Sequence, residues 1–447
     1  MTLSLTPRHR GKPRNPGRWA VWSLYALVLI AAPLLLTSSL SLTLLSQAGC
    51  LVIICLSYNI LLGQGGMLSF GHAVYAGLGS FGAVHAMNLA ASGAVDIPLP
   101  LIPLVGGLSG LFFAALLGYV TTRKAGTAFA MITLGMGELV FAMALMFPGF
   151  FGGEGGITTN RVYGRALWGI SFGPQIQVYY LIAAYCFVCT AAMFAFTGTP
   201  LGRMLNAVRD NPERVEFIGY NPRRVRHGAF MVAGFFAGIG GALAALNSEI
   251  VTAEAVSSLR SGNLLLFTFL GGATFFFGPI LGAGLMVLAL VWLSELTMAW
   301  LLYLGLVFLF MVMYAPGGLA SLIMANLRLA SHGKLQQLGA LYLALGLTAL
   351  AAWAGAAAMV EMLYHLQLDA TLGPELVFMG MTLNAAQPGA WLVAALVFLI
   401  GLGLFELARR KFLPQWCRIQ SEIEIEANMQ HDIHHARQTS FKRKETS

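Results

Sequence analysis

The sequence predicts an all-α protein, a polytopic bundle of transmembrane helices with about ten core spans and two extra spans towards the C-terminus. Three observations predict this fold class. Of the 447 residues, 57% are hydrophobic and only 10% are charged, whereas soluble domains carry about 25% charged residues. The apolar residues form runs of about 17–25 residues, the length that crosses a bilayer as a helix. The 52 glycines suit close helix packing in lipid.

The predicted spans follow these runs in chain order. We interpret the first, residues 19–37, as a retained span, because it is long enough to cross and no A-x-A cleavage site follows it. The run at 262–276 is short and is predicted to be broken or tilted. The other core spans are predicted at 42–62, 67–91, 99–121, 126–148, 178–197, 228–247, 279–298 and 300–314, and the two extra spans at 336–360 and 390–408.

The charged residues predict the orientation in the membrane. With a cytoplasmic N-terminus, all 26 Lys and Arg residues except Arg161, Arg165 and Arg260 fall on the cytoplasmic side, as the positive-inside rule requires. We therefore expect both termini to be cytoplasmic. The net charge of +8 reflects this orientation rather than a nucleic-acid partner. The predicted parts are a basic N-tail (1–18), a core (19–330), a two-span extension (331–410) and a cytoplasmic polar tail (411–447).

The central stretch 201–226, LGRMLNAVRDNPERVEFIGYNPRRVR, is the most highly charged part of the core. Asn211 can cap a helix, Pro212 suits its first position, Glu213 suits its N-terminal end and Gly219 suits its stop. A short polar helix between two membrane spans is typical of a docking element. The alternative is a charged connecting loop that only orients the protein.

Residues 57–80, SYNILLGQGGMLSFGHAVYAGLGS, place polar side chains and closely spaced glycines at membrane depth. Such a backbone is tolerated only where it is buried in protein or lines a watery cavity, and discontinuous helices often form transporter sites. The alternative is tight glycine packing with the polar groups bonded internally. The candidate pathway residues in this stretch are Asn59, Gln64, Ser69, His72 and Tyr75.

Glu138 is the ionisable residue placed most deeply within a predicted span. Charge inside a membrane is costly and often functional, so Glu138 joins the candidate pathway residues. The alternative is structural pairing with a polar neighbour.

A glycine-rich loop, FFGGEGGITT (150–159), follows the span that carries Glu138. It either faces a delivering partner, gates the pathway or is a plain flexible turn. The residues of interest are Gly152, Gly153, Glu154, Gly155 and Gly156.

Other motifs carry no catalytic chemistry. Cys186 and Cys189 lie in an apolar run and are predicted to be small core residues. His431, His434 and His435 lack a further ligand nearby, so a solvated tail is expected and no metal site is predicted. The chain has no phosphate loop, H-E-x-x-H helix or G-x-S-x-G elbow. We expect no enzyme activity and no cofactor, with any ATP energy supplied through another chain.

These motifs together resemble the membrane permease subunits of branched-chain amino acid ABC importers, specifically the M-type (LivM-like) subunits. The resemblance runs from about residue 19 to residue 328. It rests on LSYNILLGQGGMLSFGHAVYAGLGSFGA (56–83), ITLGMGE (132–138), GGEGGIT (152–158), GRMLNAVRDNPERVEFIGYNP (202–222), GGATFFFGPILGA (271–283) and YAPGGL (314–319).

The resemblance implies a permease of the bacterial inner membrane whose coupling loop, 199–228, docks into a cleft on an ATPase subunit. The implied partners are an H-type permease, two ABC ATPase subunits that hold ATP and Mg, and a periplasmic binding protein facing the glycine-rich loop. Movement of the coupling loop would pass into the spans at 178–197 and 228–247. The implied coupling residues are Ala207, Arg209, Asp210, Asn211, Pro212, Glu213 and Gly219, of which Ala207, Arg209, Asn211 and Gly219 match the family's pattern.

The sequence departs from that family after about residue 330, where the extra spans and the tail begin. Two alternatives for the function stay open. One is an ion-coupled secondary transporter working alone, and the other is the same importer class serving urea or amides.

Overall fold

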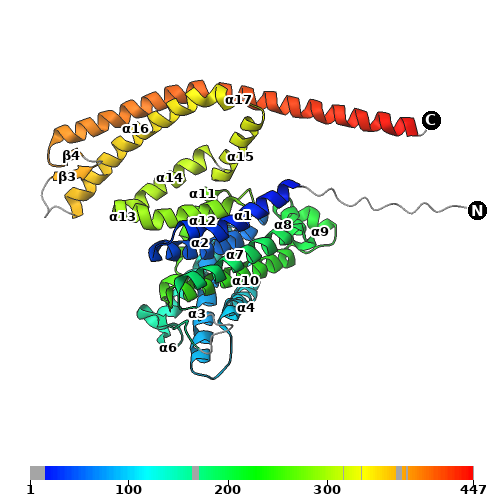
Figure 1. The fold of residues 1–447 in the computed structure, drawn as a ribbon, viewed down its shortest axis with the longest axis vertical. Helices are drawn as coiled ribbons and strands as arrows, with labels where there is room; N and C mark the ends of the chain where they lie inside the picture. Colours follow the sequence, from blue (N-terminus) through cyan, green and yellow to red (C-terminus); the bar gives the residue numbers. More distant parts are fainter. Residues whose placement is uncertain are drawn as a thin grey trace, which may run out of the picture. The chain divides into compact units, whose positions relative to one another are not determined.

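The computed structural model describes residues 16–163, 171–315, 317–333, 335–368, 375–378 and 381–445. The chain divides into two compact units, Met1–Val287 with Gly317–Leu319 and Leu288–Pro316 with Ala320–Ser447. Helices account for most of the described residues, so the predicted all-α class is confirmed (Figure 1).

The first unit is a bundle of helices around α10, and short 3₁₀ or π turns and one two-stranded pairing connect some of them. Its helices are α1 (Pro16–Leu35), α2 (Ser39–Asn59), α3 (His72–Ala91), α4 (Ile102–Thr121), α5 (Thr127–Met146), α6 (Pro148–Phe151), α7 (Gln175–Gly198), α8 (Pro200–Asp210), α9 (Pro212–Phe217), α10 (Pro222–Ser248), α11 (Ser258–Gly271) and α12 (Gly278–Leu288). Its short elements are η1 (Ile60–Gln64), η2 (Leu99–Leu101), η3 (Gly153–Gly155), η4 (Ala253–Val256), β1 (Ile157–Thr158) and β2 (Ile250–Val251).

The second unit consists mainly of two long helices, α16 and α17, which pack against each other over much of their length. Its elements are η5 (Ala289–Leu293), α13 (Ser294–Leu296), α14 (Trp300–Tyr314), α15 (Gly318–Ser331), α16 (Leu335–Leu368), β3 (Glu375–Phe378), β4 (Met381–Asn384) and α17 (Pro388–Glu445). β3 and β4 pair antiparallel, with Glu375 opposite Asn384.

Within the described ranges, eight helices are long and apolar enough to cross a membrane, or nine if α14 and α15 form one bent span. Several predicted spans differ from the observed helices at their ends. The predicted span 67–91 is helical only from His72. The predicted span 262–276 is broken after Gly271, as its short length suggested. The last predicted span continues as one helix into the polar tail, to Glu445.

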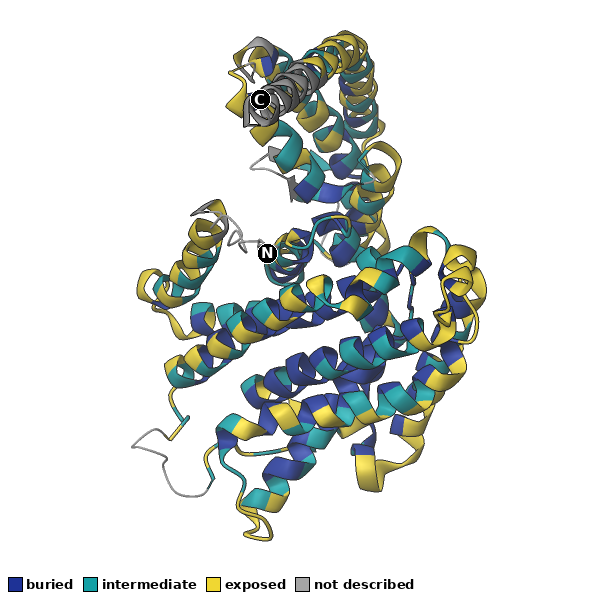
Figure 2. Cartoon of the chain, turned by 90° about the vertical axis from the view of Figure 1, so that its right-hand side faces the viewer, coloured by how far each residue is buried: buried dark blue, intermediate teal, exposed yellow. Residues whose placement is uncertain are grey.

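Glycine packing builds the core of the first unit. α10 is the most buried of the long apolar helices, and Figure 2 shows buried residues along the helices of this unit. Gly238 on α10 faces Gly106 and Gly110 on α4 and Gly79 on α3 so closely that a Cβ atom there would collide with backbone. The G-x-x-x-G pair Gly234 and Gly238 therefore packs helices, as small residues do in membranes.

The two buried cysteines of the apolar run, Cys186 and Cys189, lie on α7 in the core, as predicted. The hydroxyl of Tyr25 on α1 lies 3.1 Å from the Sγ atom of Cys186. This contact joins α1 to the rest of the first unit.

Candidate functional site

The α2–α3 connection, residues 60–71, contains two of the predicted pathway residues, Gln64 and Ser69. Here α2 passes into a π-helical turn, Ile60–Gln64, a form that is frequent at functional sites. Gly66, at φ +61°, then adopts the left-handed conformation that glycine takes without steric cost. The predicted span 67–91 becomes helical only after this connection, at His72.

Side chains of three helices hold the backbone of this connection at membrane depth. The hydroxyl of Tyr58 on α2 donates to the carbonyl oxygen of Ser69 (2.9 Å) and accepts from its N–H (3.2 Å). Thr133 on α5 accepts from the N–H of Phe70 (3.1 Å). Ser261 on α11 accepts from the N–H of Ala73, the second residue of α3 (3.1 Å). These backbone groups are thus bonded internally, as hydrocarbon surroundings require.

Three predicted pathway residues, Asn59, Ser69 and His72, carry buried polar atoms. Nε2 of His72 lies 2.9 Å from Oγ of Ser57, which also lies 2.7 Å from the carbonyl oxygen of Ile54. The proton of the contact between Nε2 and Oγ lies on either atom, depending on the tautomer of His72. Among the described residues, His72 Nδ1, Asn59 Oδ1 and Ser69 Oγ have no hydrogen-bond partner. A buried polar atom without a partner costs about 1–3 kcal/mol, so these three atoms are exceptions to the internal bonding of this stretch.

Tyr75 is also buried, one helical turn beyond His72. Its ring lies edge-on to Phe230 of α10, with 5.0 Å between the centroids. The structure thus places Ser69, His72 and Tyr75 around the start of α3, while the side chain of Asn59 lies beside Gly63 and Gln64 lies half-buried at the end of the π turn.

The central charged stretch forms two short helices. Asn211 caps α9, its Oδ1 accepting from the N–H of Arg214 (3.0 Å), Pro212 is the first helical residue, and Gly219 has φ +91° after the helix. The predicted short helix is confirmed. The preceding helix α8 is amphipathic, and its capping residue Thr199 accepts from the N–H of Gly202 (3.2 Å).

α9 and the turn after it present apolar side chains outward. Phe217 is 89% exposed and Ile218 is 64% exposed, while Val215 alone of this helix is buried. Asp210 and Glu213 are exposed beside them. This is an exposed apolar surface with a polar rim, the kind that marks an interaction site.

α8 makes direct hydrogen bonds to the α2–α3 connection. Nη1 of Arg209 donates to the carbonyl oxygen of Gly63 (2.5 Å), and Nδ2 of Asn206 donates to Oε1 of Gln64 (3.3 Å). Nε of Arg209 also pairs with Asp210 (3.1 Å). A predicted coupling residue, Arg209, and a predicted pathway residue, Gln64, are thereby brought to adjacent positions.

The glycine-rich loop lies at the other end of α10 from α8 and α9, next to α6 (Figure 1). α10 has 27 residues, which is about 40 Å at 1.5 Å per residue. We call the end of the first unit with α8 and α9 the coupling end, and the end with the glycine-rich loop the distal end. β1 pairs with β2 just after α10, with Ile157 opposite Val251. Gly152 and Gly156 have positive φ, so the loop is built on conformations that glycine favours.

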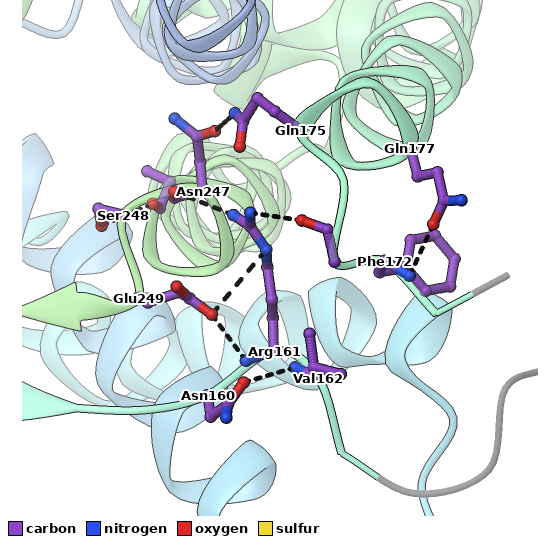
Figure 3. A network of polar contacts seen from close by, with 11 residues as sticks. Asn160, Arg161, Val162, Phe172, Gln175, Gln177, Asn247, Ser248 and Glu249 are labelled. Carbon is purple, nitrogen blue, oxygen red and sulfur yellow. Dashed lines mark hydrogen bonds and ion pairs between the residues drawn. The ribbon is translucent and has the colours of Figure 1, made fainter. Parts of the chain in front are cut away.

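A polar network fixes the chain after this loop (Figure 3). Nη2 of Arg161 donates to the carbonyl oxygen of Gly173 (3.0 Å), and the N–H of Arg161 donates to Oε1 of Glu249 (2.9 Å). Nε2 of Gln175 donates to Oδ1 of Asn247 (2.6 Å). These contacts join the loop, the start of α7 and the end of α10, so the loop is an organised element.

Two further features lie at the distal end. Glu154 and Glu254 line an open hollow of about 600 Å³ beside the last turns of α5. The hydroxyl of Tyr163 donates to the carbonyl oxygen of Ile97 (3.2 Å), and burial raises its pKa to about 12. Tyr163 is therefore a donor at any physiological pH.

Comparisons with known proteins agree with this architecture. Residues 40–317 match the model of the family described as branched-chain amino acid transport system / permease component. The chain belongs to this family. The permease is 26% identical over 301 residues to the high-affinity branched-chain amino acid transport system permease protein LivM of Salmonella typhimurium, covering 63% of this chain and 70% of that protein. It is also 26% identical over 299 residues to LivM of Escherichia coli K12, covering 62% and 69% of the two chains. No solved structure was found to match.

The family and the long apolar helices identify a multi-pass inner-membrane protein of ABC transport systems, whose permeases are in general non-catalytic. In the part of the permease that the structure describes, no group of three or more His, Cys, Asp or Glu residues could hold a metal ion. The side chains of His431, His434 and His435 lie outside the described ones.

Glu138 does not join the buried cluster at the start of α3. It lies on an exposed face of α5 with Leu134 and Met131. Among the described residues of the permease it has no hydrogen bond or ion pair, so the alternative of structural pairing finds no partner among them.

Sequence reasoning missed several residues of the site. Thr133 and Ser261 accept from backbone N–H groups far away in sequence and Ser57 contacts the side chain of His72, and hydroxyls within apolar helices give no local pattern. Asn206 and Arg161 make contacts that no spacing rule predicts. Glu361 accepts hydrogen bonds from Thr297 (2.5 Å) and Tyr303 (2.9 Å). The predicted span 336–360 ended just before Glu361, whereas α16 extends to Leu368.

Proposed function

We propose that this chain is a permease subunit of an ATP-driven importer for branched-chain amino acids or a similar small polar solute. It works with an H-type permease, two ABC ATPase subunits and a periplasmic binding protein. The relatives named LivM support the cargo. The chain carries no phosphate loop, so ATP and Mg belong to the ATPase chains.

The single observation that carries the proposal is the exposed apolar surface of α9. Phe217, Ile218 and Tyr220 are all more than half exposed at the coupling end. A loop that served only to orient the protein would need basic residues but no apolar surface. An exposed apolar patch with a polar rim suits insertion into a cleft of a soluble partner. We assign the ATPase contact to α9 and the following turn.

The pathway is proposed to run past the start of α3. The unpartnered buried atoms Nδ1 of His72 and Oδ1 of Asn59 favour contact with a polar group, such as water. An exposed carboxylate within a span costs about 2.5–3.5 kcal/mol in lipid. The exposed face of α5 with Glu138 therefore fits an aqueous pathway or the second permease subunit better than hydrocarbon.

The distal end is proposed to receive the binding protein. The loop at residues 152–156 is held by β1–β2 pairing and by the Arg161 network, which preorganises a docking surface. The hollow lined by Glu154 and Glu254 adds negative charge there, which suits a basic patch on the partner.

Replacing Phe217 tests the proposed function. The tagged chain is purified from native membranes in mild detergent, and co-purifying chains are identified by mass spectrometry. Wild type is expected to bring a second permease and an ATPase. Phe217→Ser is expected to lower ATPase recovery about tenfold or more, because central aromatic residues dominate interface energetics. The matched control is Val95→Ser, an exposed apolar residue in the α3–α4 connection.

Two results would overturn the proposal. One is full ATPase recovery with Phe217→Ser. The other is a wild-type chain that purifies alone and whose uptake in vesicles survives ATP depletion but collapses with the ion gradient. That second result would favour a secondary transporter.

A further inference from the structure

The contact between α8 and the turn after α2 joins two parts of the chain that are far apart in sequence. Arg209 and Gly63 are separated by 146 positions and Asn206 and Gln64 by 142. Leu205, fully buried on the same face of α8, packs beside Gly65. One face of α8 thus holds the glycine turn, which we define as residues 63–66.

The glycine turn is shaped to fit Arg209. A Cβ atom on Gly66 would lie 2.7 Å from Cγ of Arg209, and one on Gly63 would collide with Oδ1 of Asn59 and the carbonyl oxygen of Ala273. The aliphatic part of the arginine therefore lies over a backbone without side chains. Its guanidinium at the same time bonds to a carbonyl oxygen of the π turn. Arg209 both packs on the turn and bonds to it.

The glycine turn leads directly to the buried polar cluster. Ser69 and His72 follow it by three and six residues, and the hydrogen bonds from Tyr58, Thr133 and Ser261 hold the intervening backbone. The path from the glycine turn to Ser69 and His72 is therefore short and defined by named contacts, and it offers a direct route for a displacement of α8 to reach these residues.

We infer that Arg209, assisted by Asn206, is a positioning residue that ties movement of the docking segment to the α2–α3 connection, and is not itself an ATPase contact. The inference rests on the proposed function. In this arrangement α9 meets the ATPase, and α8, joined to it through the Asn211 cap, passes the movement to the glycine turn. This route is additional to the expected one through α7 and α10.

The geometry also separates Arg209 from the other arginine of the same helix, Arg203. Arg203 is exposed on α8 and has no side-chain hydrogen bond or ion pair among the described residues. Arg203→Gln changes the charge of α8 by the same amount as Arg209→Gln and leaves the link intact. It is the matched control.

The test uses the whole complex in proteoliposomes. Arg209→Gln is expected to keep ATPase recovery and ATP hydrolysis within about twofold of wild type while uptake falls about tenfold, a loss equivalent to about 1.4 kcal/mol. Arg203→Gln is expected to take up solute as wild type does. Arg209→Lys, which retains one donor to the Gly63 carbonyl, is expected to lie between them.

A thiol in the α2–α3 connection reports whether that connection moves when ATP is added. This separates a positioning role of Arg209 from a purely structural one. Cys417 is the one exposed cysteine, so a Cys417→Ser background carries a single new thiol at Leu68→Cys, a half-buried position between the glycine turn and Ser69 that is not a candidate pathway residue. Its reactivity with a small maleimide is expected to change when ATP is added to the intact complex. With Arg209→Gln this change should disappear although ATP is still hydrolysed.

Each outcome decides between the alternatives. Normal uptake by Arg209→Gln, or a loss of ATPase recovery equal to that of Phe217→Ser, would reject the inference alone. If Arg209→Gln fails to fold, Asn206→Ala tests the same link under the same criteria. A wild-type chain that recruits no ATPase would instead reject the proposed function.

Discussion

At the residue scale, Gly238 shows how little room the core of the first unit leaves. Its Cα lies where α3, α4 and α10 meet, and an added Cβ would be only 3.1 Å from the Cα of Gly110 while colliding with the carbonyl oxygen of Gly106. Backbone atoms cannot move aside as a flexible side chain can. The close approach that a G-x-x-x-G pair permits is therefore a requirement here.

Gly238→Ala is expected to destabilise the chain in detergent by about 1–3 kcal/mol, the usual cost of overpacking. The measurement is thermal unfolding of the purified chain by intrinsic tryptophan fluorescence. Gly284→Ala on α12 is the control, since a Cβ there meets nothing within 4 Å, and it should unfold at or slightly above the wild-type temperature. Equal effects of the two substitutions would show that this packing is unimportant.

Residue-level predictions succeeded where the physics is local. Asn211, Pro212 and Gly219 fulfil their predicted roles, because capping and left-handed turns depend on a few adjacent residues. The bond from Arg209 to Gly63 could not be predicted, since it depends on how α8 packs against α2. The exposure of Glu138 on α5 likewise depends on which face of the helix the neighbours cover.

At the element scale, the distal end of α10 depends on Arg161. Its side chain is 12% exposed and reaches Gly173 and Asn247, whereas its Nε lies 3.9 Å from the carboxylate of Glu249, which is 38% exposed. A pair this long and partly solvated contributes about 0–1 kcal/mol. The hydrogen bonds to carbonyl oxygens are therefore the stronger part of the contact.

Arg161→Ala is expected to loosen residues 157–163, with about tenfold faster hydrogen exchange at the N–H of Thr159, which bonds to the carbonyl oxygen of Glu249 (2.9 Å). Glu249→Gln keeps an oxygen for the Arg161 N–H and removes only the charge, so it should change exchange less than about threefold. A larger effect from Glu249→Gln than from Arg161→Ala would show that the ion pair dominates.

Element boundaries were predictable only where composition changes sharply. The span predicted to begin at residue 67 was misjudged because Met67, Leu68 and Phe70 are apolar, whereas tertiary contacts to Tyr58 and Thr133 hold this backbone away from a helix. α17 was cut short for the opposite reason. Its polar tail looked like a surface segment, yet it remains helical through Arg418 and Glu422, which form an i,i+4 pair.

At the scale of the whole molecule, the end of the family match and the boundary between the compact units fall at different residues. The family match ends at residue 317, close to the boundary expected near 330, whereas the compact units divide after Val287. Within the second unit, Glu361 on α16 accepts hydrogen bonds from Thr297 and Tyr303. The extension is therefore bonded to residues that the family match includes. Length and hydropathy predicted the extra spans, but only the contacts reveal this bond.

The orientation of the chain in the membrane can be tested with an exposed cysteine that the chain already carries, Cys417. α17 has 58 residues, about 87 Å at 1.5 Å per residue, which is far longer than the hydrocarbon thickness of about 30 Å. Cys417 lies on α17 beyond the apolar part and is exposed, while the other four cysteines are buried.

If both termini are cytoplasmic, a membrane-impermeant maleimide should label Cys417 in inside-out vesicles and not in cells with a permeabilised outer membrane. Val95→Cys in a Cys417→Ser background is the mirrored control, because the α3–α4 connection then lies on the periplasmic side and should be labelled only in the cells. The opposite pattern for both sites would invert the whole topology and place α8 and α9 on the periplasmic side. No ATPase could then reach Phe217, so this labelling also tests the premise of the docking assignment.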